Sequence, residues 1–246
     1  MDSPAAGVRE SMAVLPDLTT VGVVPASGAS RRMGRAKAAM QLDGRTFVQR
    51  VVDALRDGGC VDVIVVVPPD DAAVTSAVHD TGARVVVNPA PGEGPITSMR
   101  LAIEQLDEDV DAIAWLPVDY PLVDGDIVRR LRTSMSAQSV DLALPVHEYF
   151  LDGERHEKRG HPALFGRALF AELADPELDG GARSVVHRHL ADAALDTIRD
   201  PRVVTDIDTP ADYEAVRAGR SPYSDQPPEL APPELAPTEL APRGPA

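Results

Sequence analysis

The chain has 246 residues, a formal net charge of −15 at pH 7 and one cysteine, Cys60. This acidic balance argues against a general nucleic-acid binder or a protein of anionic membrane surfaces, because both carry basic patches. A single cysteine excludes an intrachain disulfide, argues against a cysteine-based zinc site and favours a cytoplasmic setting. Cys60 itself is expected to be a small buried hydrophobe rather than a catalytic thiol.

The sequence predicts one folded domain between two extensions. A domain of about 200 residues with a substantial core is expected at residues 20–218. Residues 1–19 form an N-terminal extension without the long apolar core of a signal peptide. Residues 219–246 contain near-repeats of Pro-Pro-Glu-Leu-Ala and are predicted to be a disordered tail, or alternatively a docking peptide for a protein partner. No window approaches the roughly 20 apolar residues of a membrane span.

Apolar runs alternate with segments of helical periodicity along the body of the chain. Strands are expected at residues 21–26, 61–67, 83–87, 111–116 and 140–146, and helices at residues 46–56 and 96–106. The strands are rich in Val and Ile, which predicts an α/β fold whose mostly parallel sheet is buried on both faces. Ligands of such sheets bind outside the carboxyl ends of the strands, so the loops there are the first candidates for a site.

The loop after the first strand combines small residues with a few cations. Residues 23–37 read Val-Val-Pro-Ala-Ser-Gly-Ala-Ser-Arg-Arg-Met-Gly-Arg-Ala-Lys. Gly28 and Gly34 admit backbone angles that let successive amides point at one phosphate, and Arg32 and Lys37 would add full positive charges. The spacing matches neither a P-loop nor a dinucleotide loop. The glycines alone leave open a simple turn between a strand and a helix, with cations on its surface.

A second candidate loop follows the predicted strand at residues 111–116. It reads Pro-Val-Asp-Tyr-Pro-Leu-Val over residues 117–123 and places Asp119 at the exit of a buried strand. Magnesium prefers carboxylate and phosphate oxygens and commonly takes only one or two protein carboxylates, which makes Asp119 a candidate ligand. The alternative is an aspartate that merely favours a turn beside proline.

Together the two loops resemble the site of the MobA-like NTP transferases, which are Rossmann-like nucleotidyltransferases. Their first motif is Leu-Ala-Ala-Gly-x-Ser-x-Arg-Met-Gly-x-x-Lys, and their second is an Asp followed within two residues by Pro. Positions 26, 28, 30, 32, 33, 34 and 37 match the first motif, and Pro25 and Ser27 depart from it. The resemblance implies a three-layer α/β/α fold and catalytic roles for Arg32, Lys37 and Asp119. It implies nucleotide contacts for five residues of the first loop: Ala26, Ser27, Gly28, Ser30 and Gly34.

Later segments extend the resemblance along the body of the chain. Asn88, Gly94 and Ser98 lie in a segment similar to the family's base-and-ribose segment. His161 and Arg183 lie in segments that resemble the acceptor-side motifs of the molybdenum cofactor cytidylyltransferases, where a charged imidazole or guanidinium could hold an anionic acceptor. His161 could instead be a structural histidine.

The segment at residues 206–213 resembles the family's closing strand and the cap of its last helix. Asp208 is then a second candidate metal ligand. Alternatively, it is only one of the acids that commonly stand at the start of a helix.

The function implied by this resemblance is magnesium-dependent transfer of a nucleoside monophosphate to a phosphate-bearing acceptor, with release of pyrophosphate. The expected partners are a nucleoside triphosphate, CTP or GTP, and a small phosphorylated acceptor of the molybdenum cofactor pterin type, but no nucleic acid and no membrane. CMP transfer is preferred because residues 98–100 are nearer the cytidylyl type, although residues 94–95 are similar to the guanylyl type. The alternatives are a sugar- or alditol-phosphate nucleotidyltransferase and a non-catalytic nucleotide-binding homologue.

Overall fold

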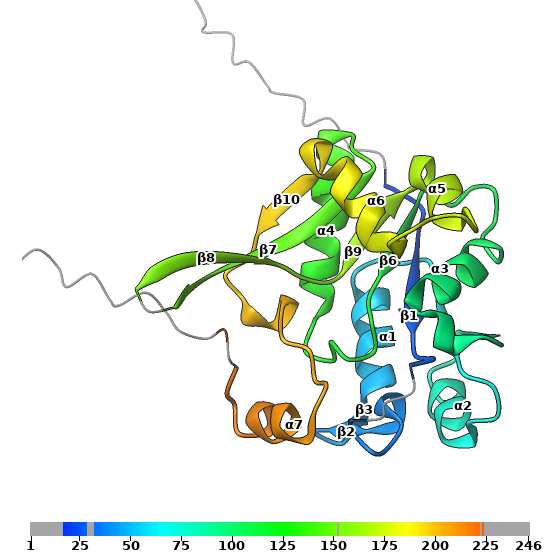
Figure 1. Ribbon diagram of the computed structural model, residues 1–246, viewed down its shortest axis with the longest axis vertical. Coiled ribbons are helices and arrows are strands. Elements are labelled where there is room, and N and C mark those ends of the chain that lie inside the picture. Colours follow the sequence, from blue (N-terminus) through cyan, green and yellow to red (C-terminus); the bar gives the residue numbers. More distant parts are fainter. Residues whose placement is uncertain (1–16, 29–31, 152, 222, 224–246) are drawn as a thin grey trace, which may run out of the picture.

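The computed structural model describes residues 17–28, 32–151, 153–221 and 223 (Figure 1). Most of the two predicted extensions, and Ser30 among the predicted nucleotide-binding residues, lie outside the described residues. None of the described helices has the length and apolar character needed to cross a membrane.

The elements alternate along the chain as the sequence predicts. The strands are β1 (Thr20–Pro25), β2 (Gln41–Leu42), β3 (Arg45–Thr46), β4 (Asp62–Val67), β5 (Arg84–Val87), β6 (Ala112–Trp115), β7 (Leu142–Leu151), β8 (Glu154–Arg159), β9 (Ala163–Gly166) and β10 (Ala194–Thr197). The helices are α1 (Phe47–Asp57), α2 (Ala72–His79), α3 (Pro95–Ile103), α4 (Gly125–Gln138), α5 (Phe170–Ala174), α6 (Gly181–His189) and α7 (Pro210–Arg217).

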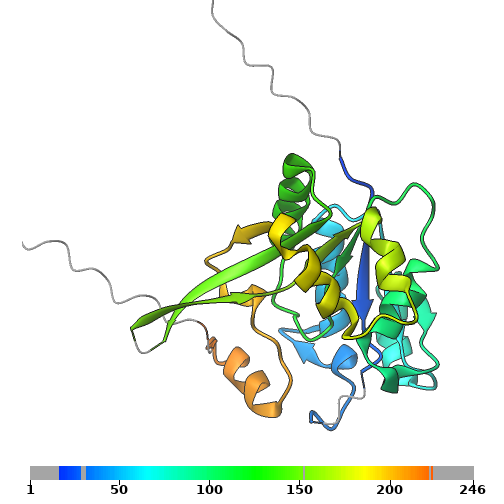
Figure 2. The ribbon, with the colours of Figure 1, turned by 45° about the horizontal axis from the view of Figure 1, so that its top comes forward.

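The main sheet is mostly parallel and has the order β10-β7-β9-β6-β1-β4-β5, with β8 paired to β7. β1 runs parallel to both β4 and β6, whereas β9 runs antiparallel to β6 and β7. Neighbouring side chains of β1 face opposite layers: Val24 packs in one apolar cluster with α1, α2 and α4, and Val23 in another with α3, α5 and α6. Helices therefore cover both faces of the sheet (Figures 1 and 2), which confirms the three-layer α/β/α prediction.

Two predictions about strands were wrong. β5 is an edge strand of the sheet, so Val85 and Val87 remain 42% and 52% exposed instead of being buried. Residues 206–208 form no strand. The amide of Ile207 donates instead to the backbone oxygen of Asp119 (2.8 Å), which fastens this segment to the loop after β6.

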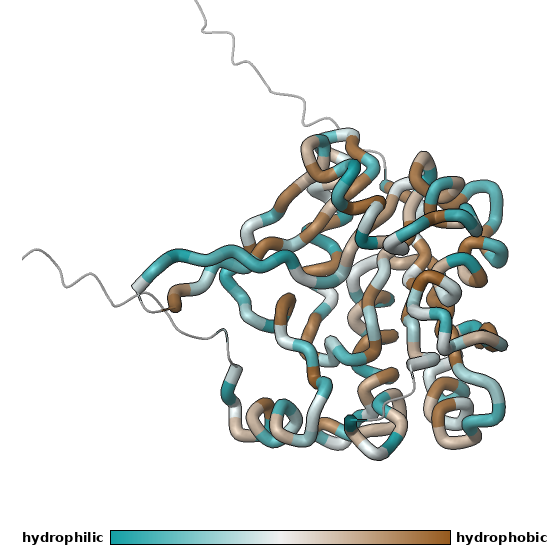
Figure 3. The backbone as a smooth tube through the Cα atoms, viewed as in Figure 1, coloured by the Kyte–Doolittle hydropathy of each residue, from teal (hydrophilic) through white to brown (hydrophobic). Residues whose placement is uncertain are grey.

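The long strand β7 continues past the predicted end at residue 146 and leaves the body as a hairpin with β8. Figure 3 shows β8 as a continuous hydrophilic stretch of this arm, in contrast to the apolar strands of the sheet. Ser221 and Tyr223, two residues of the predicted tail, contact Thr205 and the hairpin. The rest of that tail, with its predicted protein partner, lies outside the described residues.

Candidate active site

A cleft of about 1410 Å³ opens at the carboxyl ends of β1, β4 and β6. Its walls come from the loops after these strands, the start of α3, the turn before β9 and the segment before α7. This is the edge where the crossover connections of a parallel α/β sheet leave room for a ligand.

One side of the cleft joins charged groups that are far apart in the sequence. Lys37 Nζ lies 3.4 Å from Asp119 Oδ2 and also pairs with Asp208 Oδ1. Arg32 Nη1 reaches Asp208 Oδ2 at 3.2 Å. The structure thus brings together all four residues for which the sequence predicted catalytic or metal-binding roles.

The two carboxyl groups differ in their surroundings. Burial raises the pKa of Asp119 above its ordinary value, and Lys37 opposes this shift only in part. Burial is also the largest single influence on Asp208 and acts to raise its pKa, but the hydrogen bond and charge of Lys37, together with the charge of Arg32, outweigh burial and hold the pKa of Asp208 below its ordinary value. Asp119 Oδ1 is buried and has no hydrogen-bond partner among the described residues. A buried carboxylate oxygen without a partner is costly unless a donor or a cation satisfies it.

These residues fit a divalent cation that shares its ligands with a substrate. The described residues contain no group of three or more His, Cys, Asp or Glu side chains that could hold a metal ion by themselves. Magnesium does not need such a group when substrate phosphates supply further oxygens. Asp119, with its unpartnered oxygen, and Asp208 beside the same Lys37 are the residues that would hold it.

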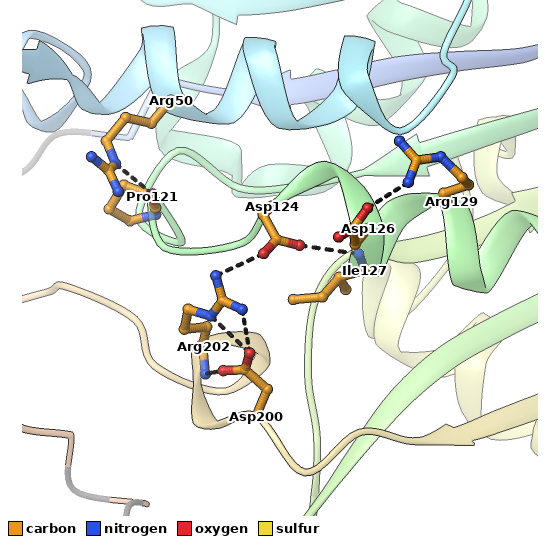
Figure 4. Close-up of polar contacts among 8 residues, drawn as sticks. All are labelled: Arg50, Pro121, Asp124, Asp126, Ile127, Arg129, Asp200 and Arg202. Carbon is orange, nitrogen blue, oxygen red and sulfur yellow. Dashed lines mark hydrogen bonds and ion pairs between the residues drawn. The ribbon is translucent and has the colours of Figure 1, made fainter.

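The loop that carries Asp119 is fastened where it leads into α4 (Figure 4). Arg50 Nε on α1 donates to the backbone oxygen of Pro121 at 2.9 Å. Asp124 caps α4 by accepting from the amide of Ile127, and its other oxygen lies 2.7 Å from Arg202 Nη1. These bonds hold the residues that follow Asp119 against α1, α4 and Arg202.

The predicted nucleotide-binding residues fall into two groups. One group lines the cleft: Ala26, Ser27, Gly28, Gly34 and Gly94. Gly34 and Gly94 have φ angles of 65° and 93°, a region that side-chain-bearing residues rarely adopt.

Asn88 and Ser98 form the second group and are fully buried. Ser98 Oγ lies 3.0 Å from Ser27 Oγ and accepts from Asn88 Nδ2 at 3.2 Å. Asn88 Oδ1 accepts from the amide of Ala90 at 2.9 Å. These bonds tie the loop after β1 to the loop after β5 and to α3, so both residues support the cleft from behind its surface.

The other side of the cleft is aromatic. The rings of Tyr120 and His161 meet edge to face with centroids 4.6 Å apart, and Trp115 lines the same region. Burial lowers the pKa of His161 to about 4, although a bond to the backbone of Trp115 opposes the shift. Burial also raises the pKa of Tyr120. Both rings are neutral near pH 7, so His161 would offer an acceptor an aromatic contact instead of a charged imidazole.

Arg183, the other predicted acceptor-binding residue, does not join His161. It is exposed on α6 and is not among the described residues that line the cleft. The sequence reasoning missed several residues of the cleft, among them Trp115, Tyr120 and Asp206. Trp115 stands at the end of a buried strand and carries no motif, and Asp206 lies in the segment that resembles a closing strand.

The fold and the paired charged loops define a nucleotidyltransferase-type site. The comparison with protein families agrees, since residues 22–194 match the model described as MobA-like NTP transferase domain. The chain belongs to this family, and the nucleotidyltransferase class predicted from the two loops is confirmed.

Two curated relatives span most of the chain. Nicotine blue oxidoreductase of Paenarthrobacter nicotinovorans is 30% identical over 190 residues, which are 76% of this chain and 91% of that protein. A protein named probable molybdenum cofactor guanylyltransferase, from Mycobacterium avium (strain 104), is 27% identical over 206 residues, or 81% of this chain and 96% of the relative.

Among solved structures, Rv0371c of Mycobacterium tuberculosis H37Rv superposes with a TM-score of 0.69 at 26% identity. The match covers 82% of this chain and 100% of that one. A structure of Rv0371c in complex with manganese gives a TM-score of 0.65 at 25% identity, with the same coverage.

Proposed function

We propose that this enzyme transfers a nucleoside monophosphate from a nucleoside triphosphate to a phosphate-bearing pterin of the molybdenum cofactor type, releasing pyrophosphate. The observation that carries the proposal is the meeting of Lys37, Asp119 and Asp208 on one side of a cleft whose other side is aromatic. The charged side suits a triphosphate, and the aromatic side suits a planar ring by stacking and edge contacts. The relative named as a guanylyltransferase of the molybdenum cofactor supports this acceptor class. The cytoplasmic setting expected from the single cysteine is part of the proposal.

The proposed metal is Mg²⁺, with Asp119 and Asp208 as its protein ligands. When bound, it would neutralise charge on the phosphate oxygens and orient them. The manganese complex of the Mycobacterium tuberculosis structure supports a divalent cation in this family.

The chain's own residues supply positioning and charge. An oxygen of the acceptor phosphate attacks the α-phosphorus, and the bond from that phosphorus to the bridging oxygen of the β-phosphate breaks. The acceptor oxygen is already ionised, so no side chain has to remove a proton. Loop amides at Gly28 and Gly34 would hold the triphosphate, while Lys37 and Arg32 would stabilise the negative charge that builds on the leaving pyrophosphate.

The donor in this proposal is CTP or GTP. The preference for CTP came from residues 98–100, but Ser98 and Met99 are fully buried and Arg100 donates to the backbone oxygen of Asp175. These side chains do not line the cleft, which weakens that argument. The name of the Mycobacterium avium relative favours GTP.

The aromatic side of the cleft also supports a second candidate, the reduction of a planar aromatic compound. The relative from Paenarthrobacter nicotinovorans is named an oxidoreductase, and the match covers 91% of its length. In this reading Trp115, Tyr120 and His161 would stack with the compound, and the charged side would hold the phosphates of a nicotinamide dinucleotide. Oxidation of NADH or NADPH in the presence of quinones or planar dyes would reveal such an activity.

A matrix assay tests the proposal. The four nucleoside triphosphates are combined with molybdopterin, a sugar phosphate or an alditol phosphate in the presence of Mg²⁺, and pyrophosphate release is measured. We expect release only with molybdopterin and with CTP or GTP, and none from Asp119→Asn. Pyrophosphate release with only a sugar phosphate or an alditol phosphate would show that the acceptor is not a pterin. Nucleotide binding without pyrophosphate release for any acceptor would indicate a non-catalytic nucleotide-binding homologue.

A further inference from the structure

Tyr223 lies beyond the part of the chain that matches the family model, yet it is packed against the β7–β8 hairpin. Its hydroxyl accepts a hydrogen bond from Lys158 Nζ at 2.6 Å, and the same ammonium lies 4.2 Å from the centre of its ring. The ring also meets Tyr149 edge to face, with centroids 5.4 Å apart. The backbone oxygen of Tyr223 lies 3.1 Å from Nε2 of the buried His147.

The same contacts reach the segment that carries Asp208. Lys158 Nζ donates to the backbone oxygen of Val204 at 3.2 Å, so one ammonium joins Tyr223 to this segment. Ser221 Oγ lies 2.9 Å from Thr205 Oγ1 and forms a second link. Residues 203–208 are thus bonded directly to Ser221 and to Lys158 of the hairpin, and Tyr223 reaches them through Lys158.

This support matters because residues 205–208 are not part of the sheet. The segment is held instead by separate bonds, including those from the amides of His161 to Val203 and of Ile207 to Asp119, both 2.8 Å. It ends at Asp208, whose carboxylate meets Lys37 and Arg32. A shift of the segment would therefore move one of the two carboxylates of the charged side.

We infer that Tyr223 is a positioning residue for Asp208, acting through Lys158 and the backbone of residues 203–208. It touches none of the reacting groups itself. The effect of Tyr223 on catalysis rests on the proposed function, in which Asp208 is a metal ligand. The effect of Tyr223 on the position of residues 203–208 does not depend on that function.

The test uses the full chain and three variants. Tyr223→Ala removes the ring and the hydroxyl, Tyr223→Phe keeps the ring beside Lys158 and Tyr149, and Leu195→Ala is a control at a side chain 48% exposed on β10. Three quantities are measured: the affinity for Mn²⁺ alone by electron paramagnetic resonance, the hydrogen exchange of the Ile207 amide, and kcat against the KM for nucleotide.

We expect Tyr223→Ala to weaken Mn²⁺ binding and lower kcat by about tenfold, the equivalent of one or two hydrogen bonds, with a smaller change in nucleotide KM. Its Ile207 amide should exchange faster while amides of α1 and β4 keep their protection. Tyr223→Phe should fall between this variant and the unaltered chain, and Leu195→Ala should match the unaltered chain.

Unchanged Mn²⁺ affinity and unchanged Ile207 exchange in Tyr223→Ala would overturn the inference. So would equal losses in Tyr223→Ala and Leu195→Ala, because the effect would then be general. If the unaltered chain transfers no nucleotide at all, yet Tyr223→Ala alone loses Mn²⁺ affinity and Ile207 protection, the proposed function fails and the positioning role stands.

Discussion

The two sides of the cleft are built on different physical principles. On one side, Lys37 joins Asp119 and Asp208 by charge. On the other, Tyr120 and His161 are packed rings that are neutral near pH 7, His161 because burial lowers its pKa. Charge suits the part of the reaction in which negative charge moves onto a leaving group, and neutral rings suit the orientation of a planar partner. Catalysis and acceptor choice should therefore respond to mutations on separate sides of the cleft.

The largest effect is expected from Asp119→Asn on the charged side. The variant keeps the size of the side chain but removes its charge, so transfer should fall by about 1,000-fold, the upper range for loss of one electrostatic contact. Stability should not fall, because burial already raises the pKa of Asp119 and so disfavours its charged form. Steady-state rates and urea unfolding at pH 7 measure both. A variant with normal turnover at saturating Mg²⁺ would remove Asp119 from the mechanism.

On the aromatic side, the neutral ring of His161 should make the free energy of unfolding depend on pH. The pKa of His161 is about 4 in the folded chain and about 6.5 when unfolded, so the unfolded state binds more protons between these values. Stability due to the neutral ring is therefore complete above pH 6.5 and declines as the pH falls towards 4, by on the order of 3 kcal/mol. Urea unfolding at pH 7, 5.5 and 4.5 measures the decline. The free energy of unfolding of His161→Asn should decline less over this pH range than that of the unaltered chain. Equal declines in the two proteins would mean that His161 is not buried as a neutral ring.

Within the charged side, Lys37 and Arg32 are expected to contribute unequally to kcat. Lys37 is 13% exposed and contacts two carboxylates, whereas Arg32 is 74% exposed and contacts one. Lys37→Ala should lower kcat about 100-fold and Arg32→Ala about tenfold, each by more than it weakens nucleotide binding. Titration calorimetry beside steady-state kinetics gives both numbers. Changes confined to KM would make the two cations ground-state anchors.

The smallest predicted effect tests the acceptor side. His161→Asn should raise the KM for the acceptor by about tenfold through lost ring contact, while nucleotide affinity stays constant. Arg183→Ala is the matched control, since that side chain is exposed on α6 outside the cleft lining, and neither constant should change. A collapse of nucleotide affinity in His161→Asn would show that the two sides are not separate.

The charged side was largely predictable because its signals are local. Gly28, Gly34, Arg32 and Lys37 stand in one short loop, and Asp119 follows a strand whose Val- and Ile-rich neighbours mark a parallel sheet. The site roles of these residues stay predictions, but the structure places them side by side. Local signals suffice when one loop carries most of the chemistry.

The aromatic side depends on pairings that sequence patterns do not show. Trp115 and His161 come together because β6 pairs antiparallel with β9, which sets Trp115 opposite Ala163. The segment at residues 206–208 resembles a closing strand in sequence, yet Ile207 bonds to the loop of Asp119, and Lys158 links Val204 to Tyr223. The neutrality of His161 likewise follows from its burial, which only the folded chain defines.

In the proposed reaction, the α-phosphorus moves from a nucleotide on the charged side to an acceptor on the aromatic side. This transfer is tested most directly by incubating the enzyme, Mg²⁺ and molybdopterin with CTP or GTP labelled at the α-phosphate or at the γ-phosphate. We expect the α-label to enter the acceptor and the γ-label to leave as pyrophosphate. An α-label recovered only in free nucleotide, with the acceptor unlabelled, would contradict it.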